Sequence, residues 1–204
     1  MQRDDFENTN KRLFERWSSV YDGFWFRLYF TPLYRYIIRV IEEKETDVLR
    51  SGGSMLDIAS GTGEILKRLA EKFPQAIFKG IDMTAAMAEK AHDKVTKLSN
   101  VSVSIGNANM LPFLDSSFDV VLISDALHHM YDPERVLAEV RRVLKTNGLF
   151  LLVDPAKETP IMVMFDWLFK PIEKAYRYYS LSMLKDLLTR CDFTILDGKR
   201  LFLN

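Results

Sequence analysis

The fold of this chain is decided at residues 54–64, which read SMLDIASGTGE. The apolar start predicts a buried strand, Gly61 and Gly63 predict a tight turn, and Glu64 opens a segment with helical spacing of its apolar residues. At such a joint the first backbone N–H groups of the helix are free, and glycine lets a ligand approach the backbone closely. The stretch therefore predicts a nucleotide-type binding turn in an α/β protein.

Short apolar runs alternate with longer amphipathic segments on both sides of the next hundred residues. This pattern is typical of βαβ units, in which right-handed crossovers place helices on both faces of a parallel sheet. Ligands of such sheets bind beyond the carboxyl ends of the strands, so functional residues should lie in the strand-to-helix turns. We predict strands at 54–59, 76–82, 101–105, 118–124 and 149–154, and helices at 63–73, 85–98 and 133–145, the last one stopped by Asn147-Gly148.

The two ends of the chain depart from this alternation. Residues 9–50 have the apolar spacing of helices that precede the sheet, and residues 182–190 predict a last helix. Asp197-Gly198 separates the runs 193–196 and 200–203, which favours a tight antiparallel hairpin. We therefore expect a single α/β domain over residues 1–204, with a doubly wound, mostly parallel, seven-stranded sheet and a C-terminal antiparallel hairpin.

Composition excludes several other classes of protein. Lysine plus arginine and aspartate plus glutamate each number 28 among 204 residues, so no net charge favours nucleic acid. The single cysteine, Cys191, cannot form an internal disulfide, and the N-terminus lacks the apolar core of a secretory signal. Charged residues interrupt every apolar stretch before the roughly 18 to 20 residues that span a bilayer. We expect a cytoplasmic protein with no nucleic-acid partner and no metal, and the oligomeric state stays open.

The glycine turn departs from two common nucleotide-binding motifs. A dinucleotide fingerprint needs a third glycine three residues after a Gly-x-Gly pair, and Leu66 stands there. A phosphate-binding loop would end in Gly-Lys-Ser or Gly-Lys-Thr, whereas this turn continues as Glu64-Ile65-Leu66-Lys67. Nicotinamide-dependent oxidation and phosphoryl transfer are therefore both disfavoured.

The order Asp57-x-Ala59-x-Gly61-x-Gly63 resembles motif I of class I S-adenosylmethionine (SAM) dependent methyltransferases, in the type 11 and ubiquinone/menaquinone biosynthesis group. In that family the turn holds the methionine portion of SAM. Ala59 replaces the usual first glycine, a change also found in the quinone-biosynthesis methyltransferases. The resemblance implies a Rossmann-like methyltransferase fold and a cofactor-binding turn made of Asp57, Ala59, Ser60, Gly61, Thr62 and Gly63.

Two further segments resemble cofactor contacts of the same family. Asp82 ends the second predicted strand, where a carboxylate can accept hydrogen bonds from ribose hydroxyls, and the resemblance places Met83 against adenine. Residues 106–119 are similar to the family's Gly-Asp-Ala…Leu-Pro-Phe…Ser-Phe-Asp run. Asn107 replaces the aspartate that accepts the adenine amino group, and its amide oxygen can still accept one hydrogen bond. We include Ala108 in the same contact.

The fourth predicted strand ends in SDALHHM, residues 124–130. In related enzymes this segment lines the cleft near the sulfonium, so we place Ser124 beside the cofactor. Asp125 and His128 are candidate catalytic residues that position an acceptor or remove its proton. Because the methyl group of SAM is already activated, orientation of the acceptor can supply much of the rate, and a carbon acceptor would additionally need a base.

Aromatic residues are dense between Trp17 and Tyr36. The run 19–22, SVYD, resembles a Tyr-Asp segment of quinone-biosynthesis and phospholipid methyltransferases that folds over the cofactor. The resemblance implies an N-terminal helical lid over residues 1–50, with Tyr21 at the cofactor. Residues 156–180 stand where this superfamily inserts substrate caps, and their apolar and basic content leaves peripheral membrane contact open.

Together these features predict a SAM-dependent methyltransferase with a small, apolar or aromatic acceptor, either a quinone precursor or a lipid-like molecule. Two alternatives stay open at this point. One is a non-catalytic SAM-binding regulatory or assembly protein that kept the cleft. The other is an NAD-dependent oxidoreductase on the same scaffold, which the missing third glycine disfavours.

Overall fold

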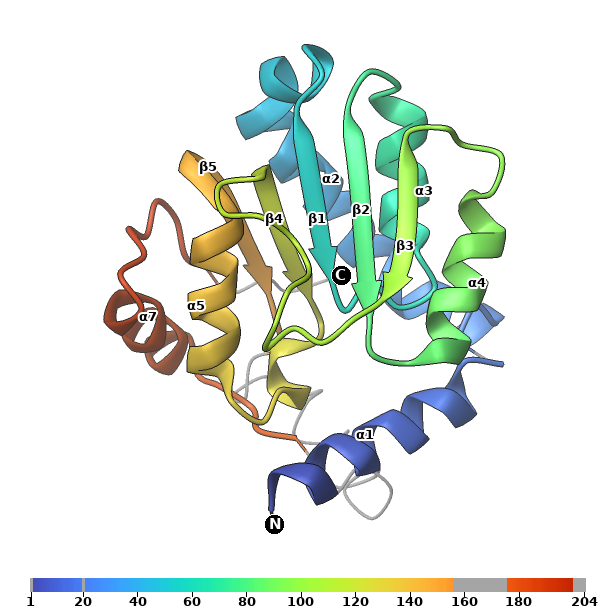
Figure 1. The fold of residues 1–204 in the computed structure, drawn as a ribbon, viewed down its shortest axis with the longest axis vertical. Coiled ribbons are helices and arrows are strands. Elements are labelled where there is room, and N and C mark those ends of the chain that lie inside the picture. The colour runs from blue at the N-terminus through green and yellow to red at the C-terminus, as the bar shows by residue number, and fades with distance from the viewer. Residues whose placement is uncertain (1, 20, 156–175, 200–204) are drawn as a thin grey trace.

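A five-stranded parallel sheet in the order β3-β2-β1-β4-β5 forms the centre of the computed structural model, which describes residues 2–19, 21–155 and 176–199 (Figure 1). Each neighbouring pair of strands is parallel. The strand order reverses between β1 and β4, which is the place where doubly wound sheets open a ligand crevice. The strands are β1 Ser54–Ile58, β2 Ile77–Asp82, β3 Val101–Ile105, β4 Phe118–Ser124 and β5 Leu144–Val153.

Helices cover both faces of this sheet, α5 on the near face of Figure 1 and α2 behind it. Side chains of β1 and β4 alternate between the two faces. Met55 and Val120 pack in the core beneath α2 and α3, whereas Leu56 and Val121 pack in the core beneath α5 and α7. The described helices are α1 Arg3–Trp17, α2 Phe24–Arg50, α3 Glu64–Lys72, α4 Ala85–Val95, the 3-10 turn η1 Leu127–His129, α5 Pro133–Val143 and α7 Leu181–Arg190.

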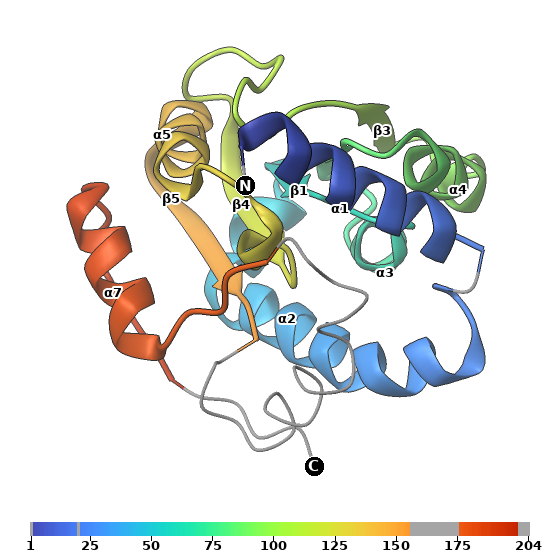
Figure 2. The same ribbon diagram turned by 90° about the horizontal axis from the view of Figure 1, so that it is seen from below.

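The N-terminal helix α1 lies across the carboxyl ends of the strands, as the view from below in Figure 2 shows. Asn10, a buried residue of α1, donates from Nδ2 to the carbonyl oxygen of His129 at 2.9 Å. The ring of Phe14 meets the His129 imidazole edge to face, with ring centres 5.0 Å apart. Segments far apart in sequence therefore close the edge of the sheet at which ligands bind.

The seven-stranded sheet predicted from the sequence is wrong for the part of the chain that the structure describes, where the sheet has five strands. Residues 193–196 form no strand, and 200–203, the other half of the predicted hairpin, lie outside the described residues. The reason is local, because the end of α7 uses the backbone donors of this segment. Asp192 has a φ of 61°, and the N–H groups of Asp192 and Phe193 bond to the carbonyls of Thr189 and Leu188. This is the six-residue helix stop of the Schellman type, which leaves those donors unavailable to a sheet.

The helix stop predicted at Asn147-Gly148 is also misplaced. Helix α5 ends at Val143, and Leu144 already begins β5. Asn147 has a φ of 63° inside an irregular stretch of β5, where the pairing with β4 shifts register between Phe118 and Val120. The pair therefore marks a bulge rather than a helix end, because both features call for a left-handed residue.

The other predicted elements are confirmed within a few residues. Ala59 leaves the first strand because its φ is 59°, a left-handed value that ends β1. Most of the predicted cap, residues 156–175, lies outside the described residues, and so does its apolar cluster at 161–169. Among the helices that the structure does describe, none is long and apolar enough to cross a membrane.

Candidate active site at the carboxyl edge of the sheet

The turn after β1 is built from left-handed residues. Gly61 has a φ of 53° and Gly63 a φ of 73°. A Cβ on Gly63 would lie 2.9 Å from the Cβ of Ala91, so this glycine lets α3 and α4 pack closely. A Cβ on Gly61 would meet only the Tyr21 ring, at 3.9 Å. Gly61 is therefore the residue that keeps the turn open toward a ligand.

Asp82 at the end of β2 fastens this turn to the neighbouring strand. Its Oδ2 accepts the N–H of Gly61 and its Oδ1 accepts the N–H of Thr84, both at 2.9 Å. Burial raises the pKa of the Asp82 carboxyl, and the two backbone hydrogen bonds oppose that rise. Each oxygen uses one acceptor position on the protein and has a second one for another donor.

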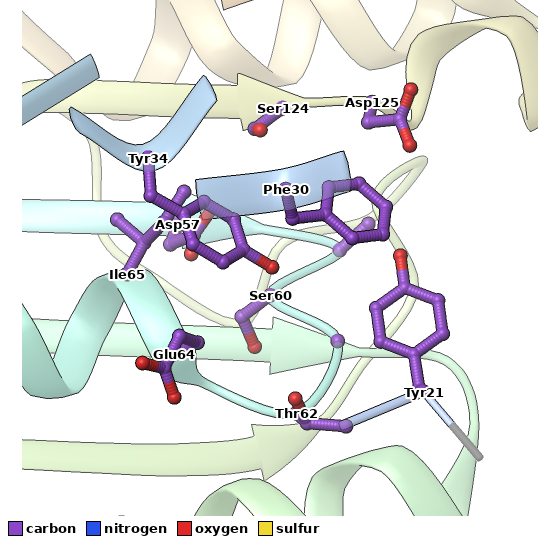
Figure 3. A pocket seen from close by; sticks show the side chains of 12 residues that line it. Tyr21, Phe30, Tyr34, Asp57, Ser60, Thr62, Glu64, Ile65, Ser124 and Asp125 are labelled. Atoms are coloured by element: carbon purple, nitrogen blue, oxygen red, sulfur yellow. The ribbon is translucent and has the colours of Figure 1, made fainter. Parts of the chain in front are cut away.

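A pocket lies between the turn, the end of β4 and the N-terminal segment (Figure 3). The space between its lining atoms is about 370 Å³, part of it open to solvent. The ring of Tyr21 stacks on Phe30, and Phe30 stacks on Tyr34, with ring centres 5.3 and 5.6 Å apart. These rings narrow the pocket from the side of α2. The lining residues are Tyr21, Phe30, Tyr34, Asp57, Ala59, Ser60, Gly61, Thr62, Glu64, Ile65, Ser124 and Asp125.

The carboxyl of Asp57 forms the inner wall of this pocket. Asp57 is 3% exposed, and among the residues that the structure describes none donates a hydrogen bond to its carboxyl. Burial, and then the nearby negative charge of Asp82, raises the pKa of Asp57 to about 8. The hydroxyl oxygen of Ser60 is also buried without a hydrogen-bond partner. Two unpartnered polar groups in one pocket indicate that the site is built to receive donors from a ligand.

The raised pKa of Asp57 predicts a pH-dependent stability of the ligand-free protein. Between about pH 4 and pH 8 the native state holds a proton on Asp57 that the unfolded chain has released, so the free energy of unfolding falls as pH rises. We expect Asp57→Asn to remove this slope, with a relative gain on the order of 3 kcal/mol at pH 9 compared with pH 4.

Urea unfolding of both proteins at several pH values measures this difference. Asp93→Asn, on the exposed surface of α4, is the matched control and should leave the native slope unchanged. Parallel stability curves for the native chain and Asp57→Asn would show that Asp57 stays ionised in the folded protein.

The end of β4 contributes a second carboxyl to the pocket. Asp125 has a φ of 54°, a left-handed value, and its side chain lies beside that of Ser124 (Figure 3). Burial raises the pKa of Asp125 to about 6, His128 opposes that rise and Asp154 adds to it. His128 is 5% exposed and does not line the pocket. Its Nδ1 lies 3.0 Å from Oδ1 of Asp154 instead.

The structure thus brings together only part of the residues selected from the sequence. Gly63, Asp82, Met83, Asn107, Ala108 and His128 do not line the pocket. Asp82 contacts it through the N–H of Gly61, and the side chain of Met83 is 36% exposed at the same edge. Asn107 is exposed, and its amide oxygen accepts two hydrogen bonds from Asn109, so this oxygen serves its own turn. No cluster of three potential metal-binding side chains occurs in residues 2–19, 21–155 and 176–199.

Sequence reasoning missed a polar network that ties the N-terminal segment to the turn. Asp22 accepts hydrogen bonds from the Thr62 hydroxyl at 2.7 Å and from Nζ of Lys94 at 2.8 Å. Lys94 also donates to Oγ1 of Thr62 at 3.0 Å and lies 3.3 Å from a carboxylate oxygen of Glu64. No sequence spacing signals this network, because its members come from the loop before α2, the glycine turn and α4. The network holds the residue next to Tyr21 against the turn.

Phe30 and Tyr34 were also not selected as site residues, although their spacing of four puts them on one face of α2. Asp154 was missed as well, and the only signal for it is an acidic residue directly after a buried strand, as with Asp82.

Comparison with known proteins agrees with this geometry. Residues 49–197 match the family model of a methyltransferase domain. A demethylmenaquinone methyltransferase of Chlamydia pneumoniae is 30% identical over 178 residues, which cover 76% of this chain and 77% of the relative. A ubiquinone/menaquinone biosynthesis C-methyltransferase of Haemophilus ducreyi is 33% identical over 142 residues, and the match covers 67% of this chain and 51% of that protein. This chain thus spans about half the length of that relative.

A solved structure of a SAM-dependent methyltransferase from Thermotoga maritima has the same fold. Its TM-score is 0.67 at 25% sequence identity, and the match covers 91% of this chain and 81% of the other. The family match and the parallel sheet with its glycine turn lead to one assignment. This chain belongs to the class I SAM-dependent methyltransferases and is an enzyme that uses SAM as its methyl donor.

Proposed function

We propose that this methyltransferase transfers the methyl group of SAM to a small, apolar or aromatic acceptor of the quinone-precursor type. The observation that carries the proposal is the pocket itself, in which three stacked aromatic rings face carboxyl groups at the strand ends. Flat apolar molecules bind well between such rings. Two relatives named for menaquinone or ubiquinone biosynthesis support the same acceptor class.

The residues of the pocket fit SAM, whose bound form supplies an activated methyl group on a positively charged sulfur. The lining residues include Asp57, Glu64 and Asp125 and no lysine, arginine or histidine. Negative charge and aromatic faces both favour a cation. The open side of Gly61 and the unpartnered Ser60 hydroxyl leave room and hydrogen-bonding capacity beside the turn. We therefore assign the methionine portion of SAM to Asp57, Ala59, Ser60, Gly61, Thr62, Gly63 and Ser124.

The ends of β2 and β3 are the place for the nucleoside. Asp82 has free acceptor positions for ribose hydroxyls, and the exposed thioether of Met83 can pack on adenine. Asn107 and Ala108 follow β3 at the same edge. For Asn107 to accept from adenine, its amide must exchange its contacts with Asn109 for the ligand.

The N-terminal segment is proposed to act as the lid of this site. Tyr21 contacts the open side of Gly61, and Asp22 fastens the segment to Thr62 and Lys94. Because the three rings narrow the pocket, cofactor entry requires them to move aside. Once closed, the lid excludes water from the reacting groups.

Asp125 is the proposed acid–base residue. It lines the pocket, and with a pKa of about 6 it is mostly ionised at neutral pH. A carboxylate there can take the proton of an acceptor hydroxyl while the neighbouring ring carbon forms its bond to the methyl group. The electron pair of the broken carbon–sulfur bond stays on sulfur, and the ring carbon then loses its proton. His128 lies behind this residue, so we assign it a supporting part.

Two measurements test the proposal. Calorimetry should give saturable binding of SAM and S-adenosylhomocysteine and none of NAD, and absence of SAM binding would remove the site assignment. Labelled methyl incorporation should then be compared among a demethylmenaquinol with a short isoprenoid tail, phospholipid vesicles and small amines. We expect label in the quinol. Label only in phospholipid or amine would reject the acceptor class, and cofactor binding without any turnover would favour the regulatory alternative.

A further inference from the structure

Asp154, directly after β5, makes an unusual set of contacts at the end of β4. Its side chain is fully buried. One oxygen, Oδ1, lies 3.1 Å from the backbone nitrogens of Ala126 and Leu127 and 3.0 Å from Nδ1 of His128. The other oxygen, Oδ2, is buried without a hydrogen-bond partner. A single carboxylate oxygen therefore holds three successive residues of the segment that follows Asp125.

The backbone before this segment is held by the same strand. Ser124 pairs with Val153, and the N–H of Asp125 donates to the Val153 carbonyl at 2.7 Å. Asp125 itself has a φ of 54°, which is unfavourable for a residue other than glycine unless its surroundings impose it. Residues 153 and 154 bind the chain at Asp125 and after it, and so impose that conformation.

We propose that Asp154 is a positioning residue for the reaction: by binding the turn after β4 and the His128 ring, it aims the Asp125 carboxyl into the pocket. The inference rests on the proposed function of Asp125. Position alone would need only an acceptor oxygen, but Asp154 also carries a charge close to Asp125 and raises its pKa. That charge makes Asp125 a stronger base than burial alone would give.

Other charged or titratable groups near Asp125 are few, and each is named here. His128 of η1 opposes the effect of Asp154. Asp57 of β1 lines the pocket, and so does Tyr34 of α2, whose pKa is raised in part by Asp57 and Asp125. None of these groups binds the backbone after Asp125, so the proposed role belongs to Asp154.

A purely structural cap and a positioning charge predict different results for Asp154→Asn. Asparagine keeps an Oδ1 acceptor for the two backbone N–H groups but loses the negative charge. We expect this variant to fold, to bind S-adenosylhomocysteine within about threefold of the native Kd, and to lower kcat about tenfold with little change in KM for the quinol. The titration midpoint of Asp125 should fall by about one pH unit, because a neighbouring negative charge is gone.

The midpoint is measured by carbon-13 NMR of labelled aspartate carboxyls in the full chain, with the Asp125 signal assigned from Asp125→Asn. Asp132→Asn is the matched control, since Asp132 also accepts a backbone N–H, that of Arg135 at the start of α5, away from the pocket. It should change neither kcat nor the midpoint. Asp154→Ala should lower kcat further, and if it fails to fold, the asparagine variant alone decides.

An Asp125 midpoint and a kcat that are both unchanged in Asp154→Asn would overturn the inference, as would equal losses in the Asp132 control. The NMR titration needs neither cofactor nor acceptor. It therefore still decides the pairing of Asp154 with Asp125 if the native protein turns out not to methylate the quinol, which is the separate failure of the proposed function.

Discussion

Asp82→Ala is expected to raise the Kd for SAM and for S-adenosylhomocysteine by two or more orders of magnitude. Two losses combine in this variant. The proposed acceptor of the ribose hydroxyls disappears, and the N–H of Gly61 loses the partner that fixes the turn. A hydrogen bond to a charged group contributes about 1.5–3 kcal/mol, and about 1.4 kcal/mol corresponds to a tenfold change in affinity. Isothermal titration calorimetry with both ligands measures the effect.

Two further variants separate the ribose contact from the support of the turn. Asp82→Asn keeps an oxygen for the N–H of Thr84 but presents an amide to the N–H of Gly61, so an intermediate loss is expected. Asp93→Ala removes an exposed carboxylate of α4 and should leave both Kd values unchanged. A folded Asp82→Ala protein with the native affinity would remove Asp82 from the cofactor site.

Asp125→Asn should lower kcat for a demethylmenaquinol at least 100-fold while the Kd for SAM changes much less. General-base catalysis typically contributes 10²–10⁴-fold, and the amide cannot take a proton. Asparagine also tolerates a left-handed φ, so the variant keeps the conformation in which Asp125 is held. The measurements are steady-state kinetics and calorimetry of the same preparations.

The pH profile provides the control for this prediction. With the native chain, kcat should rise with pH through a midpoint near 6, because the ionised carboxylate is the active form. Asp125→Asn should lose that midpoint. Native turnover in the asparagine variant would mean that the acceptor needs no base from this position, and alignment alone would then explain the rate.

Much of the fold was predictable from local sequence. The third and fourth strands have the predicted bounds, 101–105 and 118–124, because a buried parallel strand is a continuous apolar run with turn signals at each end. The glycine turn and Asp82 were also found, since both stand at strand ends. Prediction failed where one sequence signal has two structural meanings. Asn147-Gly148 and Asp192 each mark a left-handed residue, and only the packed chain shows whether it belongs to a bulge or a helix end.

The pocket was only half predictable. Tyr21, Asp57 and Asp125 were selected from motifs that the family shares, and all three line it. Phe30 and Tyr34 were missed because an aromatic residue on a helix signals core packing as well as a ligand site. Lys94 and Asp154 were missed because their partners are far away in the chain, Lys94 on the loop before α2 and Asp154 on the turn after β4.

By itself, then, the sequence determined the order of the strands and helices, the glycine turn and the methyltransferase family, because each depends on neighbours along the chain. Only the tertiary structure decided which carboxyl groups share the pocket, which of them lose water and hold a proton, and that α1 lies across the strand ends. The physical reason is that burial and charge depend on what packs around a group. Parallel strands bring together residues that the sequence separates by a helix or more.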